Sequence, residues 1–236
     1  DPQLLLFDAG DYSQGTPYFN FYHGRIEVDA MNRMGYDAIT LGNHEFDYGV
    51  DTLALVLKDA QFDVVCANYD VTNSPLENIV KQYTIIQRSK TRIGVFGIGV
   101  NPHSLIAERN FYPLKYLEPI EMAQKTADIL KLQKRCDLVI CLSHQGTHMG
   151  DVELAKATKN IDIIIGAHTH KILTDYYSVF QTDIQSCGYF FVNKIHKRLS
   201  EQSVREIIEK YAKCGSGNEA DGCIKRLDEC DSYYNG

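Results

Sequence analysis

The chain has 236 residues, 44% of them hydrophobic, which is enough to bury the core of one domain or of two small ones. Its 24 basic and 31 acidic residues give a net charge of −7, and the basic residues form no stripe, which argues against nucleic acid as a partner. No apolar run has the length of about 18 residues that a membrane span needs, so we expect a soluble domain.

Four short apolar runs recur along the chain, and each ends at residues that can bind metal ions. They are residues 4–7 before Asp8 and Asp11, 38–41 before Asn43 and His44, 138–142 before His144, and 161–165 before His168 and His170. Such runs are typical of strands that are buried on both faces in an α/β fold. Because ligands bind beyond the carboxyl ends of the strands in these sheets, the endings predict one shared site.

The stretches between these runs predict helices that pack on the sheet. Residues 25–34 place apolar side chains on one face and end at Gly35, which suits the C-terminal cap of a helix. Similar patterns predict helices at 51–60 and 119–134, and strands at 63–67 and 92–100.

From about residue 171 the pattern changes. Residues 174–177 begin like a strand, whereas 199–213 read as an amphipathic helix and are followed by Cys214, Cys223 and Cys230. The cysteine spacing matches no common zinc module, so a flexible or disulfide-tied tail is the favoured interpretation. We therefore predict a catalytic domain over residues 1–180 and an atypical helical, cysteine-containing tail over 181–236.

The remaining cysteines, Cys66, Cys136 and Cys141, lie within or beside apolar runs, which predicts reduced, buried thiols. The total of seven cysteines is odd and argues against a scaffold built on disulfides. The chain starts at Asp1 without Met or a targeting segment, so its start does not indicate the compartment.

The polar residues at the strand endings have the chemistry of a hydrolytic metal site. Asp, Asn and His supply oxygen and nitrogen donors for divalent ions, and adjacent glycines allow sharp turns. A single Gly-Asp pair is usually a turn, and a single His-x-His pair is weak evidence. Four such endings in strand context together predict a metal site.

Three blocks carry a resemblance to a known family. Gly10-Asp-Tyr-Ser-Gln-Gly15, Gly42-Asn-His-Glu-Phe-Asp47 and Gly166-Ala-His-Thr-His170 resemble motifs of the calcineurin-like metallophosphoesterase superfamily, and residues 6–15 and 41–49 resemble its 5'-nucleotidase branch. The resemblance covers about residues 3–177. It implies a four-layer α/β/β/α sandwich, here incomplete at the N-terminus and atypical at the C-terminus. It also implies a metal-dependent phosphohydrolase that removes phosphate from nucleotides.

The resemblance assigns metal ligands residue by residue. Asp11 would bridge two divalent ions (Mn, Zn, Fe or similar), Asn43, His144 and His168 would complete the set of one ion, and His170 would join Asp11 on the other. Two ions about 3.5–4 Å apart clamp a phosphoryl group and lower the pKa of a bound water. The implied reaction is attack on phosphorus by the metal-bound hydroxide.

The resemblance also assigns His44 and Asp47 to catalysis. His44 would stabilise the transition state or protonate the departing oxygen, and Asp47 would orient its ring. Two plainer interpretations remain open, in which His44 only braces Asn43 and Asp47 is the N-cap of the 51–60 helix. No role is predicted for His23, His103, His148 or His196, and Asp8 is expected to brace its loop.

The sequence departs from the family pattern before Asp11, where the family has an Asp-x-His strand. The first ion would keep only Asp11 and His170, whereas the second keeps its full set. We interpret this as an omitted N-terminal strand rather than a crippled domain. Closure of the sheet after His170 is in doubt, and no residues remain for the C-terminal domain that stacks the nucleoside, so substrate-binding residues are not assigned.

Two alternatives stay open. The same metal clamp serves cyclic-nucleotide and other phosphodiester hydrolases, and sulfur-ester relatives. A non-catalytic, truncated fragment that binds at most one metal ion belongs to a different class. The predicted partner is a small phosphate ester and not nucleic acid, with a separate C-terminal nucleotidase domain as a further possible partner. By resemblance alone, the location would be periplasmic or at the cell surface.

Overall fold

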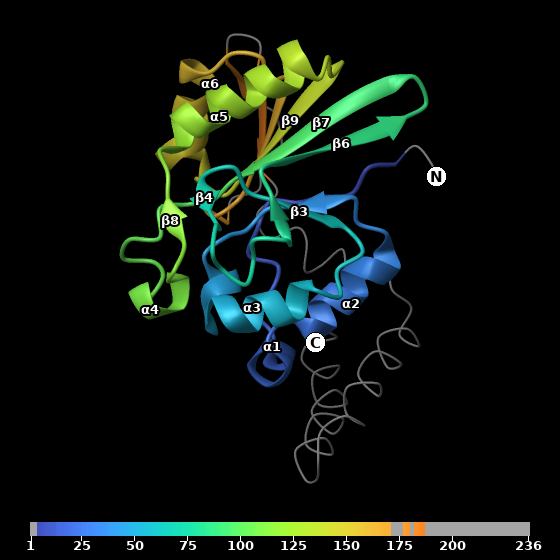
Figure 1. Ribbon diagram of the computed structural model, residues 1–236. Helices are drawn as coiled ribbons and strands as arrows, with labels where there is room; N and C mark the ends of the chain where they lie inside the picture. The colour runs from blue at the N-terminus through green and yellow to red at the C-terminus, as the bar shows by residue number, and fades with distance from the viewer. Residues whose placement is uncertain (1–3, 171–176, 180–181, 187–236) are drawn as a thin grey trace, which may run out of the picture.

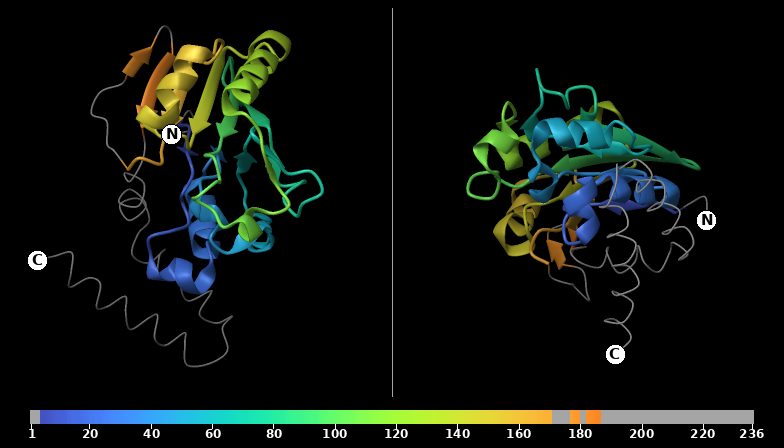
Figure 2. Two further views of the ribbon diagram at one scale, coloured as in Figure 1. Left: turned by 90° about the vertical axis from the view of Figure 1, so that its left-hand side faces the viewer. Right: turned by 90° about the horizontal axis from the view of Figure 1, so that it is seen from below.

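The computed structural model describes residues 4–170, 177–179 and 182–186. Two β-sheets lie face to face, and helices cover the outer side of each, so the predicted four-layer α/β/β/α sandwich is confirmed (Figures 1 and 2). The predicted helix at 199–213 and the cysteines at 214, 223 and 230 lie outside the described residues.

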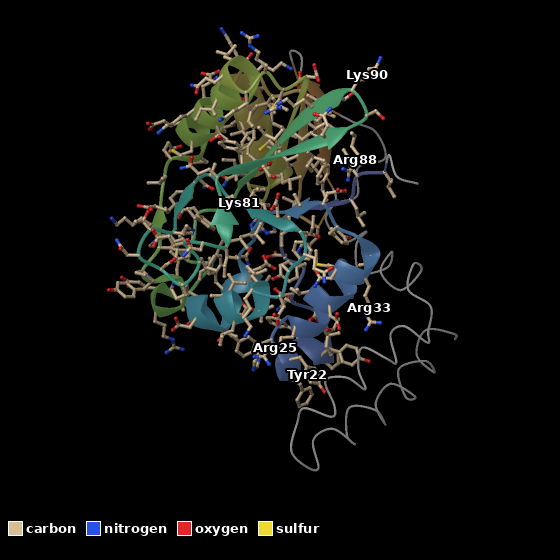
Figure 3. The ribbon with its side chains drawn as sticks, turned by 45° about the vertical axis from the view of Figure 1, so that its right-hand side comes forward. Tyr22, Arg25, Arg33, Lys81, Arg88 and Lys90 are labelled. Atoms are coloured by element: carbon tan, nitrogen blue, oxygen red, sulfur yellow. The ribbon has the colours of Figure 1, made fainter. Side chains whose placement is uncertain are left out.

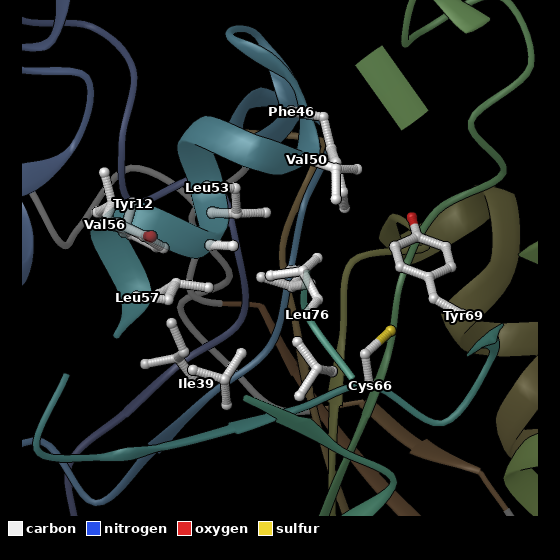
Figure 4. Packing of buried hydrophobic residues seen from close by; sticks show 14 of the residues in the cluster. Tyr12, Ile39, Phe46, Val50, Leu53, Val56, Leu57, Cys66, Tyr69 and Leu76 are labelled. Carbon is white, nitrogen blue, oxygen red and sulfur yellow. The ribbon is translucent and has the colours of Figure 1, made fainter. Parts of the chain in front are cut away.

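The first sheet is parallel and carries the N-terminal half of the chain. Its strand order is β1 (Phe7–Asp8), β2 (Ala38–Ile39), β3 (Asp63–Val65) and β5 (Val80–Lys81). The helices of this half are α1 (Pro17–Tyr22), α2 (Arg25–Met34) and α3 (Gly49–Leu57). Apolar side chains of α2 and α3 pack on this sheet, as Figure 4 shows for Leu53 and Leu57 above Ile39.

The bounds of α2 and α3 have local causes. Gly35 ends α2 at φ 73°, and its N–H bonds the carbonyls of Met31 and Asn32, so the predicted cap is confirmed. Helix α3 begins two residues before the predicted 51–60 and ends three residues earlier. The Asn32 side chain bonds the backbone of Asp59 and Gln61 at 2.8 and 2.7 Å, which draws the chain out of the helix.

The second sheet is mixed and has a parallel centre. Its strand order is β11 (Tyr177–Val179), β12 (Thr182–Ser186), β10 (Ile163–Gly166), β9 (Leu138–Ser143), β7 (Thr91–Ile98) and β6 (Tyr83–Arg88). The two outer pairs, β11 with β12 and β6 with β7, are antiparallel. Strand β12 lies beyond residue 180, where the sequence suggested a helical tail, and whether the catalytic domain ends at 180 stays a prediction.

Helices from the middle of the chain cover this second sheet. Helix α5 (Pro119–Asp128) continues as a π-helical turn (Ile129–Gln133), so the two together match the predicted 119–134, and α6 (Val152–Ala157) lies beside it. A short antiparallel pair, β4 (Tyr69–Asp70) with β8 (Lys115–Tyr116), and helix α4 (Glu108–Phe111) lie at the side of the molecule.

The two sheets approach closely. The layer between them holds aliphatic and small side chains from both, including Ala38, Val65, Val95 and Ile140. A Cβ at Gly97 would lie 2.0 Å from the Val65 carbonyl oxygen, so only glycine fits there.

Ion pairs join strands at the edges of the sheets. Lys81 of β5 pairs with Asp63 of β3 at 2.6 Å, and Arg88 of β6 pairs with Asp37 before β2. Figure 3 shows where Lys81 and Arg88 lie. The predicted buried thiols of Cys66, Cys136 and Cys141 are confirmed. Within the described residues, no helix combines the length and apolar character that a bilayer crossing requires.

Candidate metal centre

The four predicted strand endings meet at one rim of the two sheets. Strands β1 and β2 bring Asp11 and Asn43 from the first sheet, and β9 and β10 bring His144 and His168 from the second. His144 joins the halves directly, because its Nδ1–H donates to the Ala9 carbonyl at 2.7 Å. This bond fixes the ring so that Nε2 faces Asp11.

Three of the predicted ligands form one compact group. Each of Asp11, His144 and His168 offers a ligand atom, and these atoms lie within 4.8 Å of one another. His144 Nε2 is 2.9 Å from Asp11 Oδ2, and the His144 and His168 rings lie 5.1 Å apart between centroids. Within the part of the chain that is described, no other group of three or more His, Cys, Asp or Glu residues is so placed.

Asn43 adds an oxygen that lacks a partner. Its side chain is buried, and its Oδ1 accepts no hydrogen bond from the described residues. Leaving a buried acceptor unpaired costs roughly 1–3 kcal/mol. The next residue, His44, donates its backbone N–H to Asp11 Oδ1 at 2.9 Å, so Asn43 is held beside the Asp11 carboxylate.

His44 and Asp47 form a pair at the edge of the group. The chain makes a 3₁₀ turn over His44–Phe46, which brings residues three apart onto one side. His44 Nδ1 lies 3.1 and 3.3 Å from the two Asp47 carboxylate oxygens. The N-cap of α3 is Tyr48, so the alternative interpretation of Asp47 as that cap is wrong. Asn110, which sequence analysis did not single out, donates to the Asp47 carbonyl at 2.8 Å.

His170 lies apart from the compact group. Its side chain is exposed, and it is not among the residues whose ligand atoms fall within 4.8 Å. It is near enough to His168 for its charge to contribute to lowering the pKa of that ring. Its role as a ligand therefore stays a prediction.

Asp8, His23 and His103 lie outside the compact group. Asp8 braces its loop as predicted, because it accepts from the Gly10 N–H at 2.7 Å. His23 ends α1 and packs on Tyr48 with ring centroids 3.9 Å apart, and His103 is exposed. The side chain of His148 and the whole of His196 lie outside the described residues.

The charges of the group are coupled. Burial alone would lower the pKa of His144, but the hydrogen bond and charge of Asp11 raise it on balance. Burial likewise opposes ionisation of Asp11, but His144 outweighs it and lowers the pKa of that carboxyl. The pKa of His168 is lowered by burial and by the charge of His144, which keeps its imidazole neutral and able to donate a lone pair.

The backbone at the group is strained and tightly packed. Asp11 and His168 have φ angles of 63° and 71°, a region that residues with a Cβ rarely adopt and that is often found at functional sites. A Cβ at Gly42 would lie 2.3 Å from Asp11 Oδ1, so this close approach requires glycine.

The Glu45 carboxylate is buried beside the loops that carry Asp11 and Asn43, and no role was predicted for it from the sequence. It accepts hydrogen bonds from the backbone of both loops that carry Asp11 and Asn43. Its place in the Gly42–Glu45 block was the available signal, whereas nothing in the sequence indicated Asn110.

The residues present fit a divalent cation. A carboxylate, neutral imidazoles and an amide oxygen are donors that divalent transition metals accept. The bond from His144 to a backbone carbonyl is the arrangement that metal-binding histidines commonly have. The unpartnered Asn43 oxygen is the atom that a cation would satisfy.

Comparison with known proteins agrees with this geometry. The family model described as calcineurin-like phosphoesterase matches residues 1–172. A snake venom 5'-nucleotidase from Naja atra is 36% identical over 174 residues, which are 72% of this chain and 32% of that protein. The trifunctional nucleotide phosphoesterase protein YfkN of Bacillus subtilis is 32% identical over 72% of this chain and 14% of its own length.

A solved structure gives the same result. The 5'-nucleotidase precursor from Thermus thermophilus superposes with a TM-score of 0.70 and 32% identity, covering 78% of this chain and 39% of that one. The chain thus spans about a third or less of the length of these curated relatives.

Proposed function

This chain belongs to the calcineurin-like phosphoesterase family, and on that premise we propose that it is the catalytic domain of a metal-dependent phosphohydrolase that removes phosphate from nucleotides. The observation that supports the proposal is the convergence of Asp11, His144 and His168 beside the unpartnered Asn43 oxygen. In view of the family relationship, these residues would hold divalent ions against the phosphate group of a substrate.

We assign the ligands as the motifs suggest. Asp11, Asn43, His144 and His168 would hold one divalent ion, and Asp11 with His170 would contribute to a second. When bound, such ions neutralise the charge of the phosphoryl group and lower the pKa of a water molecule.

His44 then acts on the leaving group. Its Nδ1–H donates to the Asp47 carboxylate, which fixes the orientation of the ring. The other nitrogen, Nε2, can hold a proton for the departing oxygen, since the side chain is 31% exposed at the edge of the group. Asn110 holds the Asp47 backbone and so contributes to the orientation of the pair.

The choice of a nucleotide rests on the relatives. The Naja atra and Thermus thermophilus proteins are named 5'-nucleotidases, which supports a nucleoside monophosphate as substrate. The name of the Bacillus subtilis relative, a trifunctional nucleotide phosphoesterase, keeps phosphodiester hydrolysis as the second candidate. An exported location and a separate C-terminal nucleotidase domain belong to this same proposal.

The test compares substrates and metal content. Phosphate release from AMP and opening of 2',3'-cyclic AMP to an adenosine monophosphate are measured with added Mn²⁺, on the present chain and on a form extended by an N-terminal Asp-x-His strand. We expect the extended form to bind two ions per chain and to prefer AMP, and the present chain to hydrolyse an aryl phosphate poorly. A preference for the cyclic ester would favour the second candidate. One ion or none in both forms, without turnover, would indicate a non-catalytic fragment.

A further inference from the structure

Glu45 is a buried carboxylate that sits between the two loops of the first sheet. One loop follows β1 and carries Asp11, and the other follows β2 and carries Asn43. The Glu45 side chain is only 5% exposed. Burying a carboxylate is costly unless hydrogen bonds compensate it, so its partners indicate what its position achieves.

Both oxygens of Glu45 accept hydrogen bonds. Oε2 accepts from the backbone N–H of Gly42 at 2.6 Å and of Asp11 at 2.9 Å. Oε1 accepts from the Ser13 hydroxyl at 2.8 Å and from the Ser13 N–H at 3.3 Å. A single oxygen therefore links the peptide at Asp11 to the peptide before Asn43.

The link is reciprocal. Glu45 accepts from the Asp11 N–H, while Asp11 Oδ1 accepts from the His44 N–H at 2.9 Å. These bonds cross between the loops in opposite directions and fix both the backbone and the side chain of Asp11. Asp11 is held in the left-handed region at φ 63°, which its surroundings must stabilise.

We propose that Glu45 is a positioning residue, which holds the Asp11 loop against the Asn43 loop so that their oxygens can share one divalent ion. The inference rests on the metal site of the proposed function and adds a residue that does not touch the ion. Groups that orient metal ligands typically contribute 10- to 100-fold in metal affinity.

A matched control exists in the same half of the molecule. Glu27 on α2 also has a buried carboxyl oxygen, but its other oxygen accepts from the Thr16 hydroxyl at 3.2 Å, at the α1 end of the first loop. Within the described residues it makes no bond to the loop that carries Asn43, so it does not link the two loops. Glu45→Gln and Glu27→Gln each replace a carboxyl group by an amide and preserve the shape of the side chain. They differ in whether the lost carboxylate links the two loops.

The experiment is a Mn²⁺ titration of the full chain by calorimetry. For Glu45→Gln, one oxygen can still accept, but the amide NH₂ must face N–H or O–H groups where a carboxylate oxygen lay. We expect Mn²⁺ affinity about tenfold weaker, and about 100-fold weaker for Glu45→Ala. Glu27→Gln should bind as the parent chain does. Amide resonances of Asp11 and Gly42 in the metal-free protein should shift only in the Glu45 variants.

The outcomes are separable. If the parent chain binds no Mn²⁺, the metal site of the proposed function fails. If the parent binds and Glu45→Gln matches its affinity within about twofold, the positioning role is overturned. If Glu45→Gln lowers the unfolding temperature of the metal-free protein strongly, or if Glu27→Gln weakens Mn²⁺ equally, Glu45 acts on folding and not on the ligands.

Discussion

Glu45 at the rim of the sheets and Glu27 at the α1–α2 end show how differently one fold treats two buried carboxylates. Glu45 accepts four hydrogen bonds from two loops. Glu27 accepts from Thr16, while its other oxygen has no partner among the described residues, and burial raises its pKa to about 7. The carboxylate beside the predicted metal ligands is therefore hydrogen-bonded at both oxygens, whereas the one at the α1–α2 end is bonded at only one.

A buried, unpartnered oxygen does not mark a metal site by itself, as the same two regions show. Glu27 Oε2 and Asn43 Oδ1 share that property. The Asn43 oxygen lies in the loop that bonds Asp11, beside two histidines that converge on the same point, whereas Glu27 belongs to no such group. The residues around an unpartnered atom, rather than its lack of a partner, indicate a metal site.

The largest expected effect is on turnover at the rim. In an N-terminally extended, active form, His44→Ala should lower turnover roughly 10²- to 10⁴-fold, the range of a lost general acid, and leave metal content unchanged. His103→Ala, which changes an exposed histidine, is the control. The readouts are steady-state phosphate release and elemental analysis. Unchanged turnover would remove His44 from the mechanism.

The second effect tests the tight packing of the rim. A Cβ at Gly42 would collide with the Asp11 carboxylate, so Gly42→Ala should weaken Mn²⁺ binding by roughly 100-fold. Gly15→Ala is the control, because Gly15 has φ 102° but nothing within 4 Å of an added Cβ. It should affect stability more than Mn²⁺ affinity. Equal losses of affinity in the two variants would contradict the packing argument.

The third effect belongs to the α1–α2 end. Glu27 has a pKa of about 7 when folded and 4.5 as the ordinary value, so the folded state binds more protons between these pH values and stability falls as pH rises through them. Glu27→Gln removes this loss and should stabilise the chain more at pH 8 than at pH 4.5, by up to about 3 kcal/mol.

Chemical denaturation at the two pH values measures this difference. The exposed Glu108→Gln should show the same change in the free energy of unfolding at both pH values. A Glu27→Gln effect that does not vary with pH would show that its carboxyl is solvated in the folded state.

The sequence predicted the elements that have strong apolar patterns. The run at 138–142 became β9, and the one-sided pattern of 25–34 became α2, because burial on two faces or on one leaves a clear periodicity. Strands β4, β5 and β8 were not predicted, since each has two residues and no run to read. The end of α3 depends on Asn32, 27 residues upstream of the Asp59 carbonyl that it bonds, and no local pattern contains that bond.

The sequence also predicted part of the candidate metal site. Strand endings and motif blocks indicated Asp11, His144 and His168, and the structure brings these together. The same blocks could not show that Glu45 links two loops, because the bond to Asp11 spans 34 residues of chain. Nor could they show the exposed position of His170, which depends on the path of the chain after β10.

The central claim is that Asp11, Asn43, His144 and His168 surround one divalent ion. Anomalous diffraction at the manganese edge, from crystals of the chain grown with Mn²⁺, tests it most directly. We expect a peak within coordination distance of the Asp11 carboxylate, the Asn43 amide oxygen and a ring nitrogen of both histidines. A manganese peak bound elsewhere, or none at this rim, would contradict the claim.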